Sequence, residues 1–318
     1  MNKILITGGA GFIGSNLVDY LLKKNFQIWV IDNFLTSSPE NIKSFYHNPR
    51  FHFIKKNLIT TDLQKTFDYT RFDIVYHLAS PASPKKYARY PIETLLVNSE
   101  GTLKLLEYVK KTQSKEFIYA SSSEIYGDPL IHPQTEDYWG NVNPVGERSC
   151  YNEGKRFGEA LCLAYLRKYS LDIRIARIFN TYGPNMEKDD GRVISNFIVQ
   201  ALQDKLLTIY GDGQQTRSFC YVTDLVKGLY LMAIKPVKGE VINLGNDDER
   251  KIIEMAKFIK KITNSKSKIV FKPPSKDDPK KRKPNLDKAY KLLHWHPIIS
   301  LEEGLNLTIN YFRKRFYL

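Results

Sequence analysis

The chain has 318 residues, of which 42% are hydrophobic and 26% charged, with a formal net charge of +14 at pH 7. This length predicts a large core divided between two lobes. Because no apolar stretch reaches about 18 residues, we expect no membrane span.

The excess positive charge is scattered over lysine-rich helical stretches, and its one dense run is Lys280-Lys281-Arg282-Lys283. Such a run is similar to a nucleic-acid patch, and it also suits a nucleotide-sugar pyrophosphate. No aromatic platform accompanies it. We therefore expect no nucleic-acid and no membrane partner, and we interpret most of the charge as a solvated surface.

Three cysteines, Cys150, Cys162 and Cys220, form no disulfide framework, and the N-terminal residues show no charged-then-apolar leader. Both features predict a cytoplasmic location. His294 and His296 flank Trp295 without acidic or cysteine neighbours, so we expect no metal site.

Strand-like and helix-like segments alternate along the first half of the chain. Apolar runs lie at residues 3–7, 27–31, 51–54, 73–78, 116–120 and 172–177, and helical stretches lie near 12–24, 91–112 and 150–169. This alternation predicts an α/β fold built on a Rossmann-type doubly wound parallel sheet. After about residue 180, proline and glycine interrupt the chain more often, which indicates a smaller C-terminal α/β lobe. We expect residues 1–180 to bind a dinucleotide, with added segments near 215–245, and residues 181–318 to bind substrate.

A glycine-rich turn follows the first predicted strand, with Gly8, Gly11 and Gly14 at Gly-x-x-Gly-x-x-Gly spacing before a predicted helix. Glycines at such a turn let the backbone approach a pyrophosphate, which the helix N-terminus then faces with its positive end. Asp32 ends the second predicted strand. A carboxylate there accepts both ribose hydroxyls and repels a 2′-phosphate, so the pattern favours NAD over NADP.

Tyr151 and Lys155 are four residues apart and share one face of a predicted helix. We expect the ammonium to favour the phenolate and to lower the tyrosine pKa from about 10. Such a tyrosine takes a proton from a sugar hydroxyl while a nicotinamide takes the hydride. The pair therefore predicts a sugar-modifying oxidoreductase scaffold.

The segment Ser121-Ser122-Ser123-Glu124 follows the predicted strand at 116–120, at the sheet edge where open α/β proteins bind ligands. We expect a serine hydroxyl to share a hydrogen bond with the substrate oxygen, and Glu124 to act as general acid or base or to orient a sugar hydroxyl. In the second half, Arg192, Arg217 and Arg282 predict a diphosphate clamp, because arginine binds phosphate in a bidentate manner.

The chain resembles, almost end to end, the extended short-chain dehydrogenases that act on nucleotide sugars, and within them the UDP-glucuronate decarboxylases. The most specific matching stretches are residues 77–84 (HLASPASP), 123–129 (SEIYGDP), 138–144 (YWGNVNP), 148–156 (RSCYNEGKR) and 282–284 (RKP). The resemblance implies NAD-dependent decarboxylation of UDP-glucuronate to UDP-xylose through a 4-keto intermediate. It also implies tightly held NAD and a homodimer.

The resemblance implies that Tyr151 is the base, that Lys155 holds Tyr151 and the nicotinamide ribose, and that Ser122 is the hydroxyl partner. It places Glu124, beside Ser123, at the sugar ring. The implied cofactor-binding residues, besides Tyr151 and Lys155, are Gly8, Gly11, Phe12, Ile13, Gly14, Asp32, Asn33, Phe34, Asn57, Leu58, Leu78, Ala79 and Ser80. The implied substrate-binding residues are Asn180, Arg192, Asn196, Tyr210, Arg217 and Arg282.

Three positions depart from the family pattern. Ser122 stands in place of threonine and keeps the hydroxyl, and Asn57 stands in place of an aspartate that faces the adenine. Asn185 replaces an arginine, which puts a local substrate contact in doubt.

Other activities on the same scaffold stay open. A nucleotide-sugar 4,6-dehydratase benefits from an acid beside the glutamate, and Ser123 is a poor one, which argues against a dTDP-glucose dehydratase but leaves a GDP-mannose type. A 4-epimerase is a further option. A non-catalytic nucleotide sensor is disfavoured by the intact set of Ser122, Tyr151 and Lys155.

Two predicted helices carry more apolar residues than one buried face needs. The helix that begins near Tyr151 shows two apolar stripes, and the 91–112 helix carries Leu95, Leu103, Leu105, Leu106 and Val109. We expect one stripe to face the sheet and the other to face a second subunit, so that two helices from each subunit form a homodimer contact.

Overall fold

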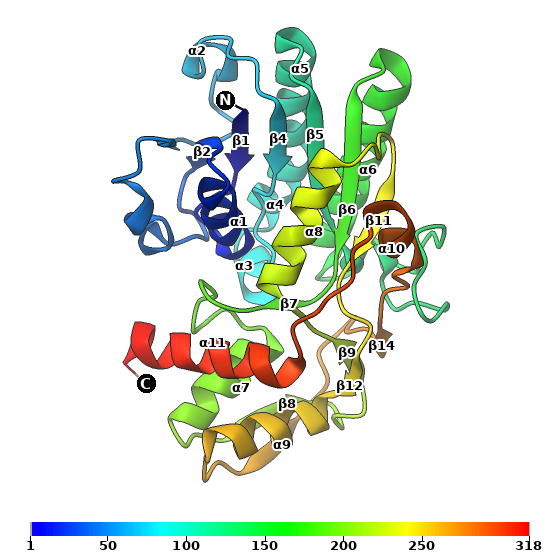
Figure 1. The fold of residues 1–318 in the computed structure, drawn as a ribbon. Helices are drawn as coiled ribbons and strands as arrows, with labels where there is room; N and C mark the ends of the chain where they lie inside the picture. Colours follow the sequence, from blue (N-terminus) through cyan, green and yellow to red (C-terminus); the bar gives the residue numbers. More distant parts are fainter. Residues whose placement is uncertain (1, 318) are drawn as a thin grey trace.

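A seven-stranded sheet forms the centre of the computed structural model, which describes residues 2–317 (Figure 1). All neighbouring strands run parallel, and this confirms the predicted doubly wound sheet. The order reverses between β1 and β4, so the carboxyl ends of these strands open a crevice. From one edge to the other the strands are β11 (Val241–Leu244), β6 (Asp172–Ile178), β5 (Glu116–Ser122), β4 (Ile74–His77), β1 (Lys3–Thr7), β2 (Gln27–Asp32) and β3 (Phe51–Lys55).

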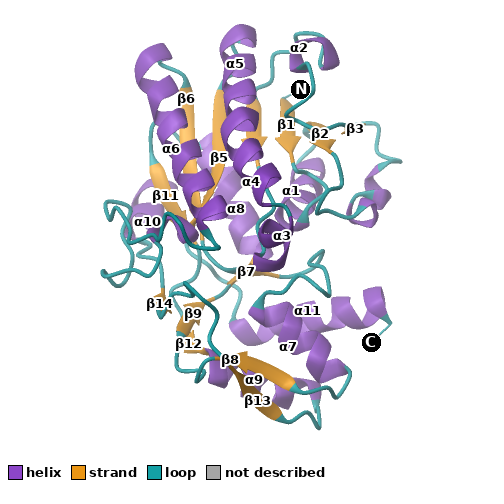
Figure 2. Cartoon of the chain, turned by 180° about the vertical axis from the view of Figure 1, so that it is seen from behind, coloured by secondary structure: helices purple, strands orange, loops and turns teal. Residues whose placement is uncertain are grey.

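Helices cover both faces of this sheet (Figures 1 and 2). Side chains alternate along β1, so Ile4 and Ile6 pack with one set of helices and Leu5 packs with the other. A sheet buried on both faces needs apolar residues at successive positions, as in the predicted strand runs. One set is α1 (Phe12–Lys23), α8 (Val222–Ile234) and α10 (Asp287–Leu293), and the other includes α5 (Thr102–Thr112) and α6 (Ser149–Tyr169). A short helix, α4 (Pro91–Leu96), packs beside α6.

The predicted 91–112 helix is interrupted by a π-helical turn, η3 (Val97–Gly101), between α4 and α5. Side chains bond back to the helix at this point, since Asn98 Nδ2 donates to Thr94 O at 2.8 Å and Thr102 Oγ1 donates to Asn98 O at 2.7 Å. Asn98 Nδ2 also donates to Ser80 Oγ at 2.9 Å. The wide turn therefore joins this helix to the loop that follows β4.

Most of the elements after β6 form a smaller layer below the carboxyl end of the sheet (Figure 1). Its core lies among three helices, α7 (Val193–Leu202), α9 (Ile252–Thr263) and α11 (Leu301–Phe316). Three small sheets complete it, with strands β7 (Thr181–Tyr182), β8 (Leu207–Tyr210), β9 (Thr216–Ser218), β10 (Cys220–Tyr221), β12 (Glu249–Lys251), β13 (Ile269–Lys272) and β14 (Lys281–Arg282).

The chain passes repeatedly between the two layers. After β6 it builds β7 to β10 below and returns for α8 and β11. It then builds β12 to β14 below, returns for α10, and ends below in α11. The boundary at residue 180, with segments near 215–245 added to the first domain, remains our proposal for dividing this path into domains.

Short helical segments connect the larger elements: η1 (Pro39–Asn41), η2 (Lys43–Phe45), α2 (Leu63–Thr66), α3 (Pro84–Arg89) and η4 (Ser123–Tyr126). Over residues 2–317, every helix is too short or too polar to cross a membrane.

Candidate active site

A cavity of about 720 Å³ lies between the carboxyl ends of the sheet strands and the smaller layer. Every cofactor, substrate and catalytic residue named from the sequence lines it, except Phe34. The Phe34 ring instead packs against Phe53, with the ring centres 5.1 Å apart. The fold therefore gathers residues from 8 to 282 around one space.

The glycine turn leaves no room for side chains. A Cβ added to Gly8, whose φ is +74°, would lie 2.7 Å from the Ala79 backbone, and one added to Gly14 would lie 2.2 Å from Gly8 O. Gly11 is the N-cap of α1 and has no side chain to cover the first N–H groups of the helix. A turn of this kind fits the close approach of a pyrophosphate.

Asp32 is held in one orientation at the end of β2. Its Oδ1 accepts from Phe34 N at 2.9 Å and Ser37 Oγ at 2.7 Å, and its Oδ2 accepts from Ala10 N at 3.1 Å. A fixed carboxylate beside the glycine turn suits the two hydroxyls of a ribose and repels a 2′-phosphate. These residues fit the dinucleotide cofactor expected from the sequence.

Tyr151 and Lys155 lie on one face of α6, as predicted, but burial dominates their protonation. Burial raises the pKa of Tyr151 to about 12, although a hydrogen bond with Ser122 acts in the opposite direction. Burial also lowers the pKa of Lys155 to about 7. The Lys155 Nζ donates to Ala120 O at 2.7 Å and lies 5.8 Å from the centre of the Tyr151 ring. The expected lowering of the tyrosine pKa is thus absent from this arrangement, because neither charged form is well solvated.

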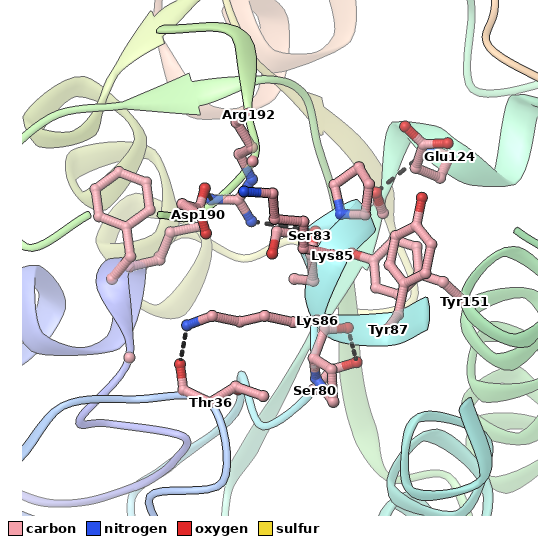
Figure 3. A pocket seen from close by; sticks show the side chains of 18 of the residues that line it. Thr36, Ser80, Ser83, Lys85, Lys86, Tyr87, Glu124, Tyr151, Asp190 and Arg192 are labelled. Atoms are coloured by element: carbon pink, nitrogen blue, oxygen red, sulfur yellow. Dashed lines mark hydrogen bonds and ion pairs between the residues drawn. The ribbon is translucent and has the colours of Figure 1, made fainter. Parts of the chain in front are cut away.

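Tyr87, on α3, is a site residue that the sequence did not reveal. Its ring stacks on Tyr151 with the centres 5.2 Å apart and the planes 13° from parallel (Figure 3). Its hydroxyl accepts from Arg148 Nε at 2.9 Å. The signal that was available is its position just after the specific stretch at 77–84.

Five charged side chains, which we call the charged cluster, lie beyond Tyr151: Glu124, Arg148, Arg217, Asp278 and Arg282. Arg282 is 1% exposed and donates through Nη1 to Glu124 Oε1 and through Nη2 to Gly127 O at 3.0 Å. Arg148 Nη1 lies 3.9 Å from Glu124 Oε2. Of these five residues, only Glu124, Arg217 and Arg282 were expected from the sequence.

Arg282 and Arg148 keep Glu124 negatively charged. Burial alone raises the pKa of this carboxyl, but the charges of Arg282 and Arg148 outweigh burial and lower the pKa to about 2. A carboxylate with this pKa accepts hydrogen bonds at neutral pH and holds no proton to donate. Of the roles considered from the sequence, orientation of a hydroxyl agrees better with this charge than general-acid catalysis.

The serines before Glu124 stand in the same turn. Ser122 Oγ accepts from Glu124 N at 3.2 Å, and Ser123 begins η4 and is 3% exposed. Behind them, Ser121 Oγ donates to Glu159 Oε1 at 2.5 Å, and Glu159 pairs with Arg177 at 2.8 Å. Glu159 thus ties the ends of both β5 and β6 to α6, and it lies four residues after Lys155.

Arg192 and Asn185 lie in the segment that enters the smaller layer. Arg192 Nη2 donates to Ala82 O at 3.1 Å, and Nη1 pairs with Asp190 at 3.3 Å. The side chain of Asn185, at the position of the missing arginine, donates to Ser15 Oγ at 3.0 Å and accepts from Tyr311 OH at 3.1 Å. Asn185 thus joins α1 to α11.

Lys86, on α3, reaches across the cavity toward the loop that follows β2 (Figure 3). Its Nζ donates to Thr36 O and lies 3.9 Å from Glu187 Oε2.

Residues 2–317 contain no group of three or more His, Cys, Asp or Glu side chains placed to hold a metal ion.

Comparison with known proteins gives matches over nearly the whole chain. Residues 4–245 match the family model described as the NAD dependent epimerase/dehydratase family. UDP-glucuronic acid decarboxylase 1 of Xenopus tropicalis is 48% identical over 98% of this chain and 72% of its own length. UDP-glucuronic acid decarboxylase 6 of Arabidopsis thaliana is 48% identical over 98% of this chain and 89% of its own length.

Solved structures of similar proteins share the whole fold. The UDP-glucuronic acid 4-epimerase of Bacillus cereus, in complex with UDP-glucuronic acid and NAD, is 34% identical with a TM-score of 0.90, and the match covers 98% of this chain and 99% of that one. The UDP-glucose 4-epimerase of Thermotoga maritima, with UDP-glucose, is 33% identical with a TM-score of 0.91, and the match covers 99% of both chains.

Proposed function

The chain belongs to the NAD dependent epimerase/dehydratase family, and we propose that it is a UDP-glucuronate decarboxylase that forms UDP-xylose and CO₂. The observation that carries this proposal is the 48% identity with curated UDP-glucuronic acid decarboxylases over 98% of the chain. The solved epimerases that resemble it reach only 33–34% identity over the same length. The lining of the cavity supports the proposal, because it contains the glycine turn, the Tyr151 base and the arginines of the charged cluster.

The glycine turn and Asp32 would hold NAD⁺, with the pyrophosphate over the turn and a ribose at Asp32. When bound, NAD⁺ supplies a nicotinamide that accepts a hydride from C4 of the sugar and later returns it. The C4 ketone of the substrate is then β to the C6 carboxylate. Loss of CO₂ becomes easy because the electrons flow into that ketone as an enolate, which is protonated at C5.

Tyr151 takes the proton of the C4 hydroxyl and gives it back at the end of the reaction. The phenolate–ammonium form of Tyr151 and Lys155 contains as many protons as the phenol–amine form. A proton that moves from Tyr151 to Lys155 therefore makes the base without any uptake from solvent. Ser122, hydrogen-bonded to Tyr151, positions the same substrate oxygen.

Glu124 and Ser123 support a decarboxylase over a dehydratase. Glu124 is ionised against Arg282, so it orients a sugar hydroxyl by accepting a hydrogen bond. Ser123 stands where a 4,6-dehydratase benefits from an acid that protonates a departing C6 hydroxyl. We assign the substrate diphosphate to the expected arginine clamp of Arg192, Arg217 and Arg282. The other expected substrate contacts are Asn180, Asn196 and Tyr210.

The test is an incubation of the purified protein with UDP-glucuronate and NAD⁺, followed by CO₂ measurement and identification of the sugar by mass spectrometry and NMR. We expect stoichiometric CO₂ and UDP-xylose, and little 4-keto-6-deoxy product from dTDP-glucose. UDP-galacturonate without CO₂ would identify a 4-epimerase, the activity of the Bacillus cereus neighbour. Rapid dehydration of dTDP-glucose with UDP-glucuronate left intact would contradict both assignments.

Cofactor choice gives a separate test. In protein stripped of its nucleotide, NAD⁺ should restore activity much better than NADP⁺, because the Asp32 carboxylate repels the 2′-phosphate. The variant Asp32→Asn keeps the shape and removes the charge, so its preference for NAD⁺ should narrow. Equal activity of the wild type with both cofactors would mean that Asp32 does not face the ribose.

We further propose a cytoplasmic homodimer. The support for a dimer is a set of exposed apolar side chains on α4, α5 and α6, namely Leu95 (39% exposed), Leu103 (41%) and Phe157 (52%). Light scattering at micromolar concentration should give twice 36.9 kDa, and a 36.9 kDa species alone would contradict the dimer.

The support for a cytoplasmic location is that Cys150, Cys162 and Cys220 are free and buried, as in a reducing compartment. Cell fractionation tests it.

A further inference from the structure

Two arginines of the charged cluster share one carboxylate. Asp278 Oδ1 lies 3.1 Å from Arg148 Nη1, and Asp278 Oδ2 lies 2.9 Å from Arg217 Nη2. The three residues come from separate parts of the chain: Arg148 precedes α6, Arg217 lies on β9, and Asp278 lies in residues 273–280, the loop between β13 and β14. All three line the cavity.

Asp278 is the most exposed member of this trio. Its side chain is 32% exposed, against 14% for Arg148 and 8% for Arg217. The carboxylate is therefore the part of the trio that solvent reaches most readily. An anion that enters the cavity would compete with it there.

The backbone of the loop is held by Arg148 Nη1, which donates to Asp277 O at 3.1 Å, and by Asp128 Oδ1, which accepts from Lys280 N at 2.8 Å. The other side-chain contacts of the loop are exposed. Lys276 Nζ lies 3.7 Å from Glu147 Oε1, and both side chains are about four-fifths exposed (81% and 78%). Asn143 Nδ2 donates to Asp277 Oδ1 at 3.2 Å, near solvent. Exposed pairs of this kind contribute little to stability. Among the loop side chains, Asp278 thus makes the closest ion pairs with the cavity.

A carboxylate and a phosphate use the same guanidinium donors. Arginine binds either group through parallel N–H groups in one plane, so one N–H cannot serve both at full strength. A diphosphate placed beside Asp278 would also meet a like charge. The two anions therefore compete for Arg148 and Arg217.

We propose that Asp278 is an internal competitor for the diphosphate of the substrate, and that the nucleotide displaces it from Arg148 and Arg217. This inference rests on the proposed function, since it takes the substrate to be a nucleotide sugar. It assigns Asp278 the task of setting how tightly the cavity holds a nucleoside diphosphate. This competition lowers the affinity of the cavity for the nucleoside diphosphate, which favours release of the product.

The experiment is a calorimetric titration of UDP into the wild type, Asp278→Asn and Asp277→Asn. Asp278→Asn keeps the size and removes the competing charge, so UDP should bind about two- to fivefold more tightly, the range of a partly exposed ion pair. Asp277→Asn is the matched control, because Asp277 touches Arg148 only through its backbone carbonyl. Its UDP affinity should stay within about twofold of the wild type.

Uridine serves as the second control, because it lacks the diphosphate. Its affinity should be the same in the wild type and in Asp278→Asn. Equal or weaker UDP binding by Asp278→Asn would overturn the inference and make Asp278 a residue that positions the arginines for the ligand. An equal gain for uridine would also overturn it, since a general loosening of the loop would then explain the result. Failure of the wild type to bind UDP would instead count against the proposed function itself.

Discussion

The Tyr151–Lys155 pair and the charged cluster share one cavity, yet the charges of the two regions differ. At the pair, burial pushes both groups toward their neutral forms, with pKa values of about 12 for Tyr151 and about 7 for Lys155. In the cluster, Glu124 is also largely enclosed, with 16% of its side chain exposed, but its pKa falls to about 2 because Arg282 and Arg148 face it. Burial is common to both regions, and the presence of a charged partner distinguishes them.

This difference suits the task of each region. A group that passes a proton on needs both its protonated and its deprotonated form within reach, and Lys155, with a pKa of about 7, has both at neutral pH. A group that must present a constant charge to a sugar or a diphosphate needs a partner that holds it ionised. Substitutions that remove either the proton or the partner should therefore have distinct effects.

The largest effect is expected from Tyr151→Phe, which keeps the ring stacked on Tyr87 and removes the movable proton. Turnover should fall by about 10²–10⁴-fold, the range of general-base catalysis. The affinity for UDP should stay unchanged, because the charged cluster is intact. Steady-state kinetics and calorimetry check both parts, and near-normal turnover would remove Tyr151 from the mechanism.

Arg282→Met should destabilise the fold, because it leaves the enclosed Glu124 carboxylate without its closest partner. We expect the free energy of unfolding to drop by about 3–5 kcal/mol, as for other broken buried pairs. Arg250→Met is the control, since its pair with Asp248 is half exposed and should contribute less than about 1 kcal/mol. Urea unfolding measures both. Adding Glu124→Gln to Arg282→Met should restore part of the stability, because it removes the unpaired charge. If it restores none, the loss of stability does not come from the Glu124–Arg282 pair.

Lys155→Met should change how stability depends on pH. Because the folded-state pKa of Lys155 is lowered to about 7, the cost of burying its charge is fully present below pH 7. That cost is relieved as the pH rises toward the ordinary value of 10.5. The stability of the wild type relative to Lys155→Met should therefore rise with pH above 7, by at most about 1.4 kcal/mol per pH unit. Urea unfolding from pH 6 to 9 tests this, with the exposed Lys168→Met as control. A difference that stays flat would mean that Lys155 keeps its charge.

The smallest effect is expected from Tyr87→Phe, which cuts the hydrogen bond between the two regions and keeps the ring stack. Loss of the Arg148 Nε contact should cost about 0.5–1.5 kcal/mol of stability, or up to about tenfold in kcat/KM. Kinetics with UDP-glucuronate measure it. A hundredfold loss would show instead that the Tyr87 hydroxyl acts directly on the substrate.

The parts of the site that depend on local spacing were predictable from the sequence. Tyr151 and Lys155 share a helical face because of the 3.6-residue period, Asp32 follows an apolar strand run, and the glycine turn is marked by its own spacing. The doubly wound sheet follows from the alternation of apolar runs and helical stretches. In each case a few neighbouring residues contain the whole signal.

The rest of the site depends on where distant segments meet. Arg148 and Asp278 are 130 residues apart and make a pair only because a loop of the smaller layer folds over the start of α6. The direction of the Tyr151 pKa depends on burial, which residue spacing does not reveal. Phe34 has a left-handed backbone, with φ of +59°, and this turns its ring to Phe53 instead of the cavity.

The central sheet is completed late in the chain. Its edge strand β11 spans Val241–Leu244, although the neighbouring strand β6 ends at Ile178. At about 5–20 residues per second, ribosomes take several seconds to make the residues between them, and the edge of β6 has no partner during that time. An unpaired edge can pair with another chain. Nascent chains that end between residues 180 and 240 are therefore the lengths at which this protein most needs a chaperone.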